Sequence, residues 1–280
     1  MPFASVEGFV DHIQHELDNN RLILPTLPDV AIKVMNAVAQ QDTSSKELAT
    51  IILTDAALSA RLIRVANSPL YRGHNEINHV QMAVSRLGNT TVRTLVNSLV
   101  IQQMFKPSSK FLEDAFKQIW EQNKNVAAIS RAIAAFAPHL NADEAMLAGL
   151  IHQIGKLPIL MLIEQFPKFR DSPTLTNRLA EKAHPAVGKM IMDSWYFPVD
   201  LKPVASEYNN FQYDSGASAD YVDVVQVAFL ESIAGTDHPA CRVDCSTVPA
   251  FAKLGLNADI EIQEIEGVAD TVELAKNTFF

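Results

Sequence analysis

The feature that most constrains the fold is the spacing of apolar residues, which recur every three or four positions along almost the whole chain. Residues 6–17 and 30–38 each carry such a stripe, and no run of alternating apolar and polar residues is long enough to require a sheet. Apolar residues at this interval line one face of an α-helix. The sequence therefore predicts an all-α protein.

Short sequence signals predict where several helices begin and end. Ser44 followed by Glu47 forms a capping box, in which each side chain bonds the other residue's backbone N–H. Asp55 is the expected N-cap of the next helix, and Gly88 is expected to end a later one. Pro185 is expected to open a helix over 185–196, separate from one over 174–182.

A short polar segment broken by Pro107 divides the chain into two predicted helical lobes. Residues 1–110 are expected to form an N-terminal helical subdomain, and residues 111–280 a second helical subdomain. The second lobe should start with a long helix that ends near Phe136 and should finish with an acidic helix over about 260–277. We therefore expect a two-lobed helical bundle.

Composition indicates an ordinary globular protein of 280 residues, because 48% of them are hydrophobic and 20% are charged. The N-terminus lacks the basic start and apolar centre of a secretory signal, and no segment suits a membrane span. We expect a cytoplasmic protein that binds no membrane. The net charge of −9 also argues against binding to nucleic acid, which requires a basic surface.

One segment reverses this charge, since residues 56–105 contain five arginines, no lysine and a single acid. Guanidinium groups suit carboxylates and phosphates. Four of these arginines are candidates for contact with a partner or for clamping the two lobes together: Arg61, Arg64, Arg86 and Arg93. Alternatively, they pair with the acidic second half of the chain or solvate the surfaces of their helices.

The segment from Ala148 to Leu157 is similar to a metal-binding hydrolase motif whose carboxylate has been replaced. A histidine beside an aspartate suits a divalent ion, because nitrogen and oxygen bind together and the carboxylate offsets the ion's charge. Here Gln153 follows His152. The glutamine keeps the shape of the expected aspartate side chain but lacks its negative charge.

Three ordered motifs make the chain resemble the HDOD family over about residues 20 to 230: Leu24–Pro28, Asp55–Ser68 and Ala83–Gly88. HDOD domains are regulatory relatives of the HD and HD-GYP phosphohydrolases. The resemblance implies an N-terminal helical subdomain followed by an HD-like helical domain. It also implies bacterial signal transduction without an established catalytic activity.

The resemblance places a degenerate HD pocket at six positions: Gln122, His152, Gln153, Lys156, His184 and Asn209. Only the two histidines among them match metal ligands of active relatives, and the closing aspartate falls near Phe229, which cannot ligate. Two histidines without an anionic ligand would hold a metal ion only loosely. We therefore expect no metal, no cofactor and no catalytic residue.

Three functions follow from this pattern. We expect a regulatory module that is not an enzyme and that binds signalling proteins of unknown identity. The alternatives are a residual metal-dependent phosphohydrolase or phosphodiesterase at His152 and His184, and a sensor that binds a small anionic nucleotide through Lys156. A separate zinc site made by His238, Cys241 and Cys245 is less favoured than a surface loop, because the spacing fits no common zinc pattern.

Overall fold

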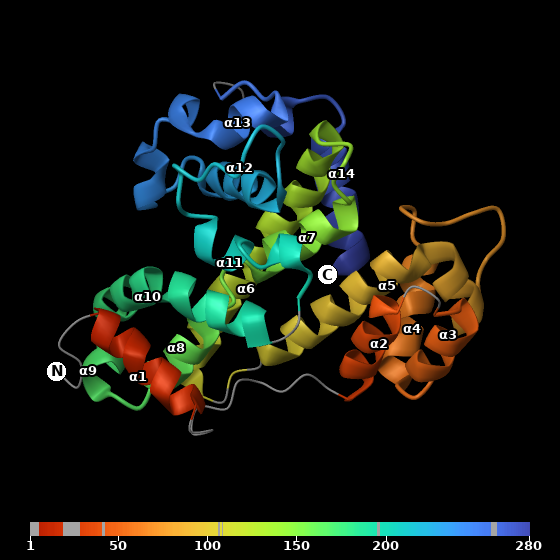
Figure 1. Ribbon diagram of the computed structural model, residues 1–280, viewed down its shortest axis with the longest axis horizontal. Coiled ribbons are helices and arrows are strands. Elements are labelled where there is room, and N and C mark those ends of the chain that lie inside the picture. Colours follow the sequence, from red (N-terminus) through yellow and green to blue (C-terminus); the bar gives the residue numbers. More distant parts are fainter. Residues whose placement is uncertain are drawn as a thin grey trace.

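The computed structural model describes residues 6–18, 29–40, 43–105, 107, 109–194, 197–258 and 262–280. Within these ranges the regular elements are all helices, and no strand occurs among them (Figure 1). The prediction of a two-lobed all-α fold is confirmed. The motif at residues 24–28 lies outside the described residues. The division of the chain near residue 110 remains a prediction, since residues 106 and 108 also lie outside them.

In the described part of the first lobe the helices are α2 (Asp29–Ala39), α3 (Ser45–Ile52), α4 (Ala56–Ala66) and α5 (Val80–Met104). The capping box of Ser44 and Glu47 is present at the start of α3, and the Asp55 side chain caps α4. Gly88 adopts φ 77° and interrupts the helical backbone of α5. These predicted helix ends are therefore confirmed, with Gly88 making a kink rather than a full stop.

The second lobe begins with α6 (Lys110–Ile133), which a short 3-10 turn extends to Phe136 as the sequence predicts. The other helices follow in chain order: α7 (Ala142–Ile151), α8 (Lys156–Ile163), α9 (Pro167–Arg170), α10 (Pro173–Ser194), α11 (Val204–Glu207), α12 (Tyr221–Ile233), α13 (Pro249–Leu254) and α14 (Val268–Phe279). The final helix starts at Val268, later than predicted.

The expected break at Pro185 is wrong, because α10 runs without interruption from Pro173 to Ser194. A proline inside a helix removes one backbone hydrogen bond and crowds the preceding turn. Packing compensates here, since α10 contacts α8, α9 and α11 and buries Ala183, Val187 and Ile191. Tertiary burial therefore overrides the local preference of the proline.

The first helix, α1 (Val6–Asp18), packs against α10 of the second lobe (Figure 1). Phe9 and Ile13 from its predicted apolar stripe are fully buried. The side chains of Val6 and Leu17 in the same stripe lie outside the described residues. The chain thus contributes one helix to the second lobe before it builds the first.

A polar junction at the start of α7 joins the two lobes. Asp143 accepts hydrogen bonds from Tyr71 at 2.6 Å and from Thr91, both in the first lobe, and forms an ion pair with Arg131 of α6. The next residue, Glu144, pairs with Arg93 of α5 and also accepts a hydrogen bond of 2.7 Å from Tyr221 of α12. The junction therefore satisfies its buried charges with partners from both lobes.

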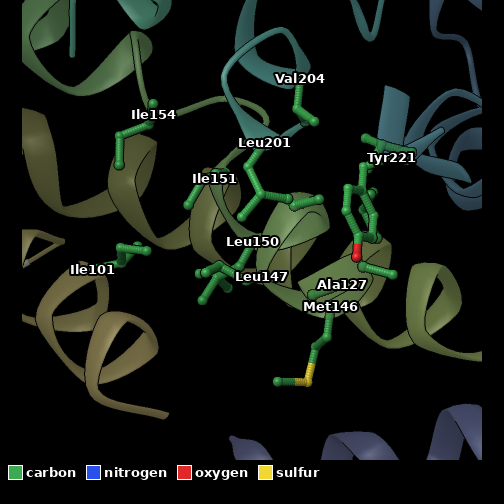
Figure 2. Packing of buried hydrophobic residues seen from close by; sticks show 14 of the residues in the cluster. Ile101, Ala127, Met146, Leu147, Leu150, Ile151, Ile154, Leu201, Val204 and Tyr221 are labelled. Atoms are coloured by element: carbon green, nitrogen blue, oxygen red, sulfur yellow. The ribbon is translucent and has the colours of Figure 1, made fainter. Parts of the chain in front are cut away.

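Residues 142–163 are apolar and long enough to cross a membrane, but 94% of their most apolar window is buried within the fold. Figure 2 shows Met146, Leu147, Leu150 and Ile151 packed among side chains from other helices, such as Ile101. This stretch lies in the core, and His152 lies within it, directly after α7.

Candidate functional site

His152 lies in the turn that follows α7 and is fully buried. Its Nδ1 donates to the carbonyl oxygen of Gly149 at 2.6 Å, which fixes the proton on Nδ1 and leaves Nε2 as an acceptor. Nε2 has no hydrogen-bond partner among the described residues. Burial lowers the pKa of His152 to about 3, so the ring is neutral at physiological pH.

His184 lies on α10 and is also fully buried. Its Nε2 shares a hydrogen bond of 3.1 Å with the Tyr208 hydroxyl and lies 3.7 Å from a carboxylate oxygen of Glu181. Burial is the main cause that holds its pKa well below the usual value, and the positive charge of Lys156 adds to it. His184 is therefore a second neutral imidazole.

A glycine brings these two segments together. A Cβ atom on Gly155, just before α8, would collide with the carbonyl oxygen of His184 and with the backbone of Gly188. Only a residue without a side chain lets the turn after His152 approach α10 so closely.

Tyr208 occupies the space beside both histidines. Its ring centroid lies 4.6 Å from that of His152, 5.5 Å from that of His184 and 5.1 Å from that of Phe229. Its exposed fraction is 1%. Tyr208 thus fills the cluster, whereas the predicted Asn209 beside it is only partly buried.

The two glutamines of the predicted pocket are in contact. Nε2 of Gln153 donates to Oε1 of Gln122 at 3.2 Å, while Oε1 of Gln153 has no partner among the described residues. The neighbouring Asn123 is buried and donates to the Leu150 carbonyl at 3.0 Å. These amides hold α6 to the end of α7, and none of them carries a charge.

Lys156 is buried at 5% exposure, and its Nζ donates to Glu181 at 2.5 Å. Burial lowers the pKa of Lys156, while the carboxylate of Glu181 opposes this effect. Sequence reasoning missed Glu181, because nothing in a helical stretch of mixed charge distinguishes it from a solvated residue. Its position three residues before His184, one helical turn away, is the only signal that could have found it.

The cluster of His152, His184, Tyr208, Lys156 and Glu181, hereafter the His152–His184 cluster, does not fit a metal ion. The two imidazoles supply no negative charge, the position of the partner carboxylate is Gln153, and Nε2 of His184 already shares a hydrogen bond with the Tyr208 hydroxyl. No group of three His, Cys, Asp or Glu side chains in the described part of the chain is arranged to hold a metal. Divalent ions in proteins generally need such a set.

The alternative zinc site is likewise not assembled. Nδ1 of His238 accepts the backbone N–H of Ala240, and Sγ of Cys241 donates to the carbonyl of Ile233. The ring of His238 instead contacts Phe229, at a centroid distance of 5.4 Å. His238 is thus a neighbour of the His152–His184 cluster that sequence reasoning had placed elsewhere.

The four candidate arginines do not form one surface. Arg61 donates to the Phe279 carbonyl of α14, and Arg93 pairs with Glu144 at the junction. Arg86 donates to the carbonyls of Ala66 and Asn75, which hold the segment after α4. Arg64 alone is exposed. Two of these residues make the interlobe contacts that the clamping alternative anticipated.

Comparison with known proteins gives one family. The profile of the HDOD domain matches residues 24–211, which is more than half of the chain. No curated protein matches at a significant level.

Solved structures share the whole fold. A proposed metal-dependent phosphohydrolase from Shewanella amazonensis is 27% identical, with a TM-score of 0.81, and the match covers 98% of this chain and 99% of that one. An HDOD domain protein of unknown function from Geobacter sulfurreducens is 20% identical, with a TM-score of 0.65 and 99% coverage of both chains. A proposed signal transduction protein from Marinobacter aquaeolei is 18% identical, with a TM-score of 0.62, and the match covers 93% of this chain and 60% of that one.

Proposed function

Because this chain belongs to the HDOD family, we propose that it is a cytoplasmic signalling module of bacterial type, which binds other proteins and catalyses no hydrolysis. The family supports the signalling role, and the His152–His184 cluster supports the absence of catalysis. The module keeps the helical frame of a phosphohydrolase and uses it as a scaffold.

The observation that carries this proposal is the position of Tyr208. Hydrolysis by a metal-bound water needs an open coordination position and space for the substrate beside it. Tyr208 packs against both histidines, and the exposed fractions of His152 and His184 are 0%. Phe229 closes the same cluster from α12. A phosphoester has no path to either imidazole in this arrangement.

A residual metal-dependent phosphohydrolase is the alternative, favoured by the likeness to the Shewanella protein, which is described as such an enzyme. The nucleotide sensor has less support, since the charge of Lys156 is already balanced by Glu181 within the fold. A ligand would first have to displace that carboxylate.

Metal content and phosphoester turnover test the proposal together. We would express the protein without an affinity tag in medium with manganese, iron and zinc, and measure metal per chain by plasma mass spectrometry. We would then offer bis-p-nitrophenyl phosphate and cyclic dinucleotides with manganese, magnesium or iron. We expect less than stoichiometric metal and no turnover above the His152→Ala/His184→Ala double variant. If turnover occurs and requires both histidines, the protein is a metal-dependent phosphohydrolase instead.

A further inference from the structure

Helix α14 packs along α6 of the second lobe, and its final turn reaches the first lobe (Figure 1). The carbonyl oxygen of Phe279 accepts a hydrogen bond from the guanidinium group of Arg61 on α4. The ring of Phe279 also meets the ring of Tyr71 edge-on, with centroids 6.1 Å apart. Phe279 is only 3% exposed. One buried residue of α14 therefore contacts the first lobe through both its backbone and its side chain.

The second lobe holds the same ring through Arg131 of α6. The guanidinium carbon of Arg131 lies 5.5 Å from the centroid of the Phe279 ring and 5.8 Å from that of the Tyr71 ring. Arg131 is also the partner of Asp143 at the junction. A cation near an aromatic face is attracted by the ring electrons, and this attraction is stronger where water is excluded. Phe279 thus joins the two lobes beside the polar junction.

The neighbouring residue extends these contacts along α6. The ring centroid of Phe280 lies 6.0 Å from that of Trp120, and Trp120 lies 5.1 Å from Phe105 at the end of α5. Aromatic rings at such distances attract one another in addition to the apolar area that they bury. The end of α14 therefore supplies apolar contacts close to both connections between the lobes.

The contact between α5 and α7, which also joins the lobes, contains buried polar groups. Thr91 of α5 donates to Asp143 of α7, and Thr94 and Asn97 follow at three-residue intervals along the same side of α5. Thr94 and Asn97 are 0% and 2% exposed, yet Oγ1 of Thr94 and Nδ2 of Asn97 have no hydrogen-bond partner among the described residues. Burying a polar group without a partner costs free energy.

These polar groups favour separation of the lobes, because Thr94 and Asn97 would regain hydrogen bonds to water when α5 and α7 part. Polar contacts between the domains of one chain generally permit relative motion. The aromatic contacts of α14 act in the opposite direction, since they are lost when the lobes separate. The balance between the closed and the open arrangement therefore depends on α14.

From this arrangement we infer that α14 is a releasable strap that holds the two lobes closed, with Phe279 as the residue that fastens it and the contact between α5 and α7 as the place where the lobes part. This inference goes beyond the proposed function, because a strap of this kind can control a protein-binding module and an enzyme alike.

The test measures the distance between the lobes in the full chain by pulsed electron paramagnetic resonance. Spin labels are attached at two exposed positions, Lys46→Cys on α3 and Arg178→Cys on α10, after Cys241 and Cys245 have been replaced by serine. We expect one narrow distribution of distances in this labelled background. Phe279→Ala removes the ring contacts with both lobes and should add a second population of distances.

Phe251→Ala in the same background is the matched control. Phe251 is similarly buried, at 7% exposure, but it lies on α13, which packs against α12 within the second lobe. This variant should lower the melting temperature without adding a second population of distances. Circular dichroism would verify that the helices persist in both variants.

A milder variant tests the fastening without leaving a cavity at Phe279. Arg61→Ala removes only the bond from α4 to the Phe279 carbonyl, and it should give a smaller second population than Phe279→Ala does. Arg64→Ala, which changes an exposed arginine on the same helix, should give none. This pair keeps the inference testable if Phe279→Ala does not fold.

Identical distances in the labelled background, Phe279→Ala and Arg61→Ala would overturn the inference. An equal second population in Phe251→Ala would also overturn it, because the change would then follow from lost stability rather than from the strap. A second population already present in the labelled background would show that α14 does not hold the lobes closed. None of these outcomes alters the metal and turnover test of the proposed function.

Discussion

The ring of Tyr208 meets the imidazole of His152 edge-on, with ring centroids 4.6 Å apart and an interplanar angle of 86°. This contact predicts that two substitutions of Tyr208 lower the free energy of unfolding by very different amounts. Tyr208→Ala would leave a cavity among buried rings and should lower the free energy of unfolding by about 3–5 kcal/mol. Tyr208→Phe keeps the ring and removes the hydroxyl that bonds His184, and it should cost about 1 kcal/mol. Urea denaturation at pH 7 measures both, and a cost for Tyr208→Ala below that of Tyr208→Phe would show that the ring does not fill the cluster.

Acidification should destabilise the protein through its buried histidines. The pKa of His152 is about 3 in the folded protein and 6.5 without the fold, so between these values the unfolded chain binds a proton that the folded chain excludes. Stability is therefore full above pH 6.5 and falls as the pH decreases toward 3, by about 2 kcal/mol at pH 5 from this residue alone.

The variant His152→Asn retains a donor for the Gly149 carbonyl and should flatten this dependence of unfolding free energy on pH. The exposed His74→Asn is the control and should leave the slope unchanged. Equal slopes in all three proteins would mean that His152 is not the buried neutral group described above.

The ion pair of Lys156 and Glu181 is unequal, because 7% of the lysine side chain and 45% of the glutamate side chain are exposed. Removing the carboxylate leaves a buried charge without a partner, so Glu181→Ala should cost about 1–3 kcal/mol. Lys156→Met removes the charge itself and should change stability by less than about 1 kcal/mol. Thermal unfolding measures the loss of stability in both variants. A larger loss in Lys156→Met than in Glu181→Ala would indicate that the ammonium group itself stabilises the cluster.

Among the polar sites described above, substitution at the junction between the lobes should cause the largest loss of unfolding free energy. Asp143→Asn leaves Arg131 without its anion and should cost about 3 kcal/mol, since breaking a buried pair strands the remaining charge. The control is Glu121→Ala, which removes an exposed carboxylate from its pair with the half-buried Lys124 and should cost under about 0.5 kcal/mol. Chemical denaturation measures the free energy of unfolding of both variants. Similar losses in the two would show that the junction does not stabilise the protein more than an ordinary surface ion pair does.

Arg61 and Arg64 should separate into different roles. Arg61→Ala loses the bond to the Phe279 carbonyl and should lower the melting temperature by a few degrees, as about 1 kcal/mol does in a domain of this size. Arg64→Ala changes an exposed side chain and should leave the melting temperature unaltered. Differential scanning calorimetry distinguishes them, and a loss of stability in Arg64→Ala would contradict its exposed position.

Local sequence signals predicted those features of the helices that depend only on neighbouring residues. The capping box at Ser44 and the interruption of the helix at Gly88 are set within one helical turn, so the sequence alone sufficed to predict them, although Gly88 kinks α5 rather than ending it. The continuous helix through Pro185 could not be predicted in this way, because packing against α8 and α11 outweighs the local effect of the proline.

Only part of the candidate site was predicted, because a sequence motif identifies some of its residues and helix packing supplies the others. His152, Gln153 and His184 were found from the family motif, and the structure brings the two histidines to one tyrosine. Tyr208 contributes because of where α11 packs, which no spacing in the sequence expresses, whereas the spacing of Glu181 from His184 was the one signal available for Glu181. The arginines were predicted by composition, but their separate partners depend on the docking of the lobes.

The position of α1 has a consequence for synthesis on the ribosome. This helix precedes the first lobe in the chain, yet it packs against α10, which is synthesised only after the whole first lobe and part of the second. During that interval the apolar face of α1 has no native cover, and it is available to a chaperone or to a neighbouring chain. The order of translation and the order of assembly therefore differ for α1.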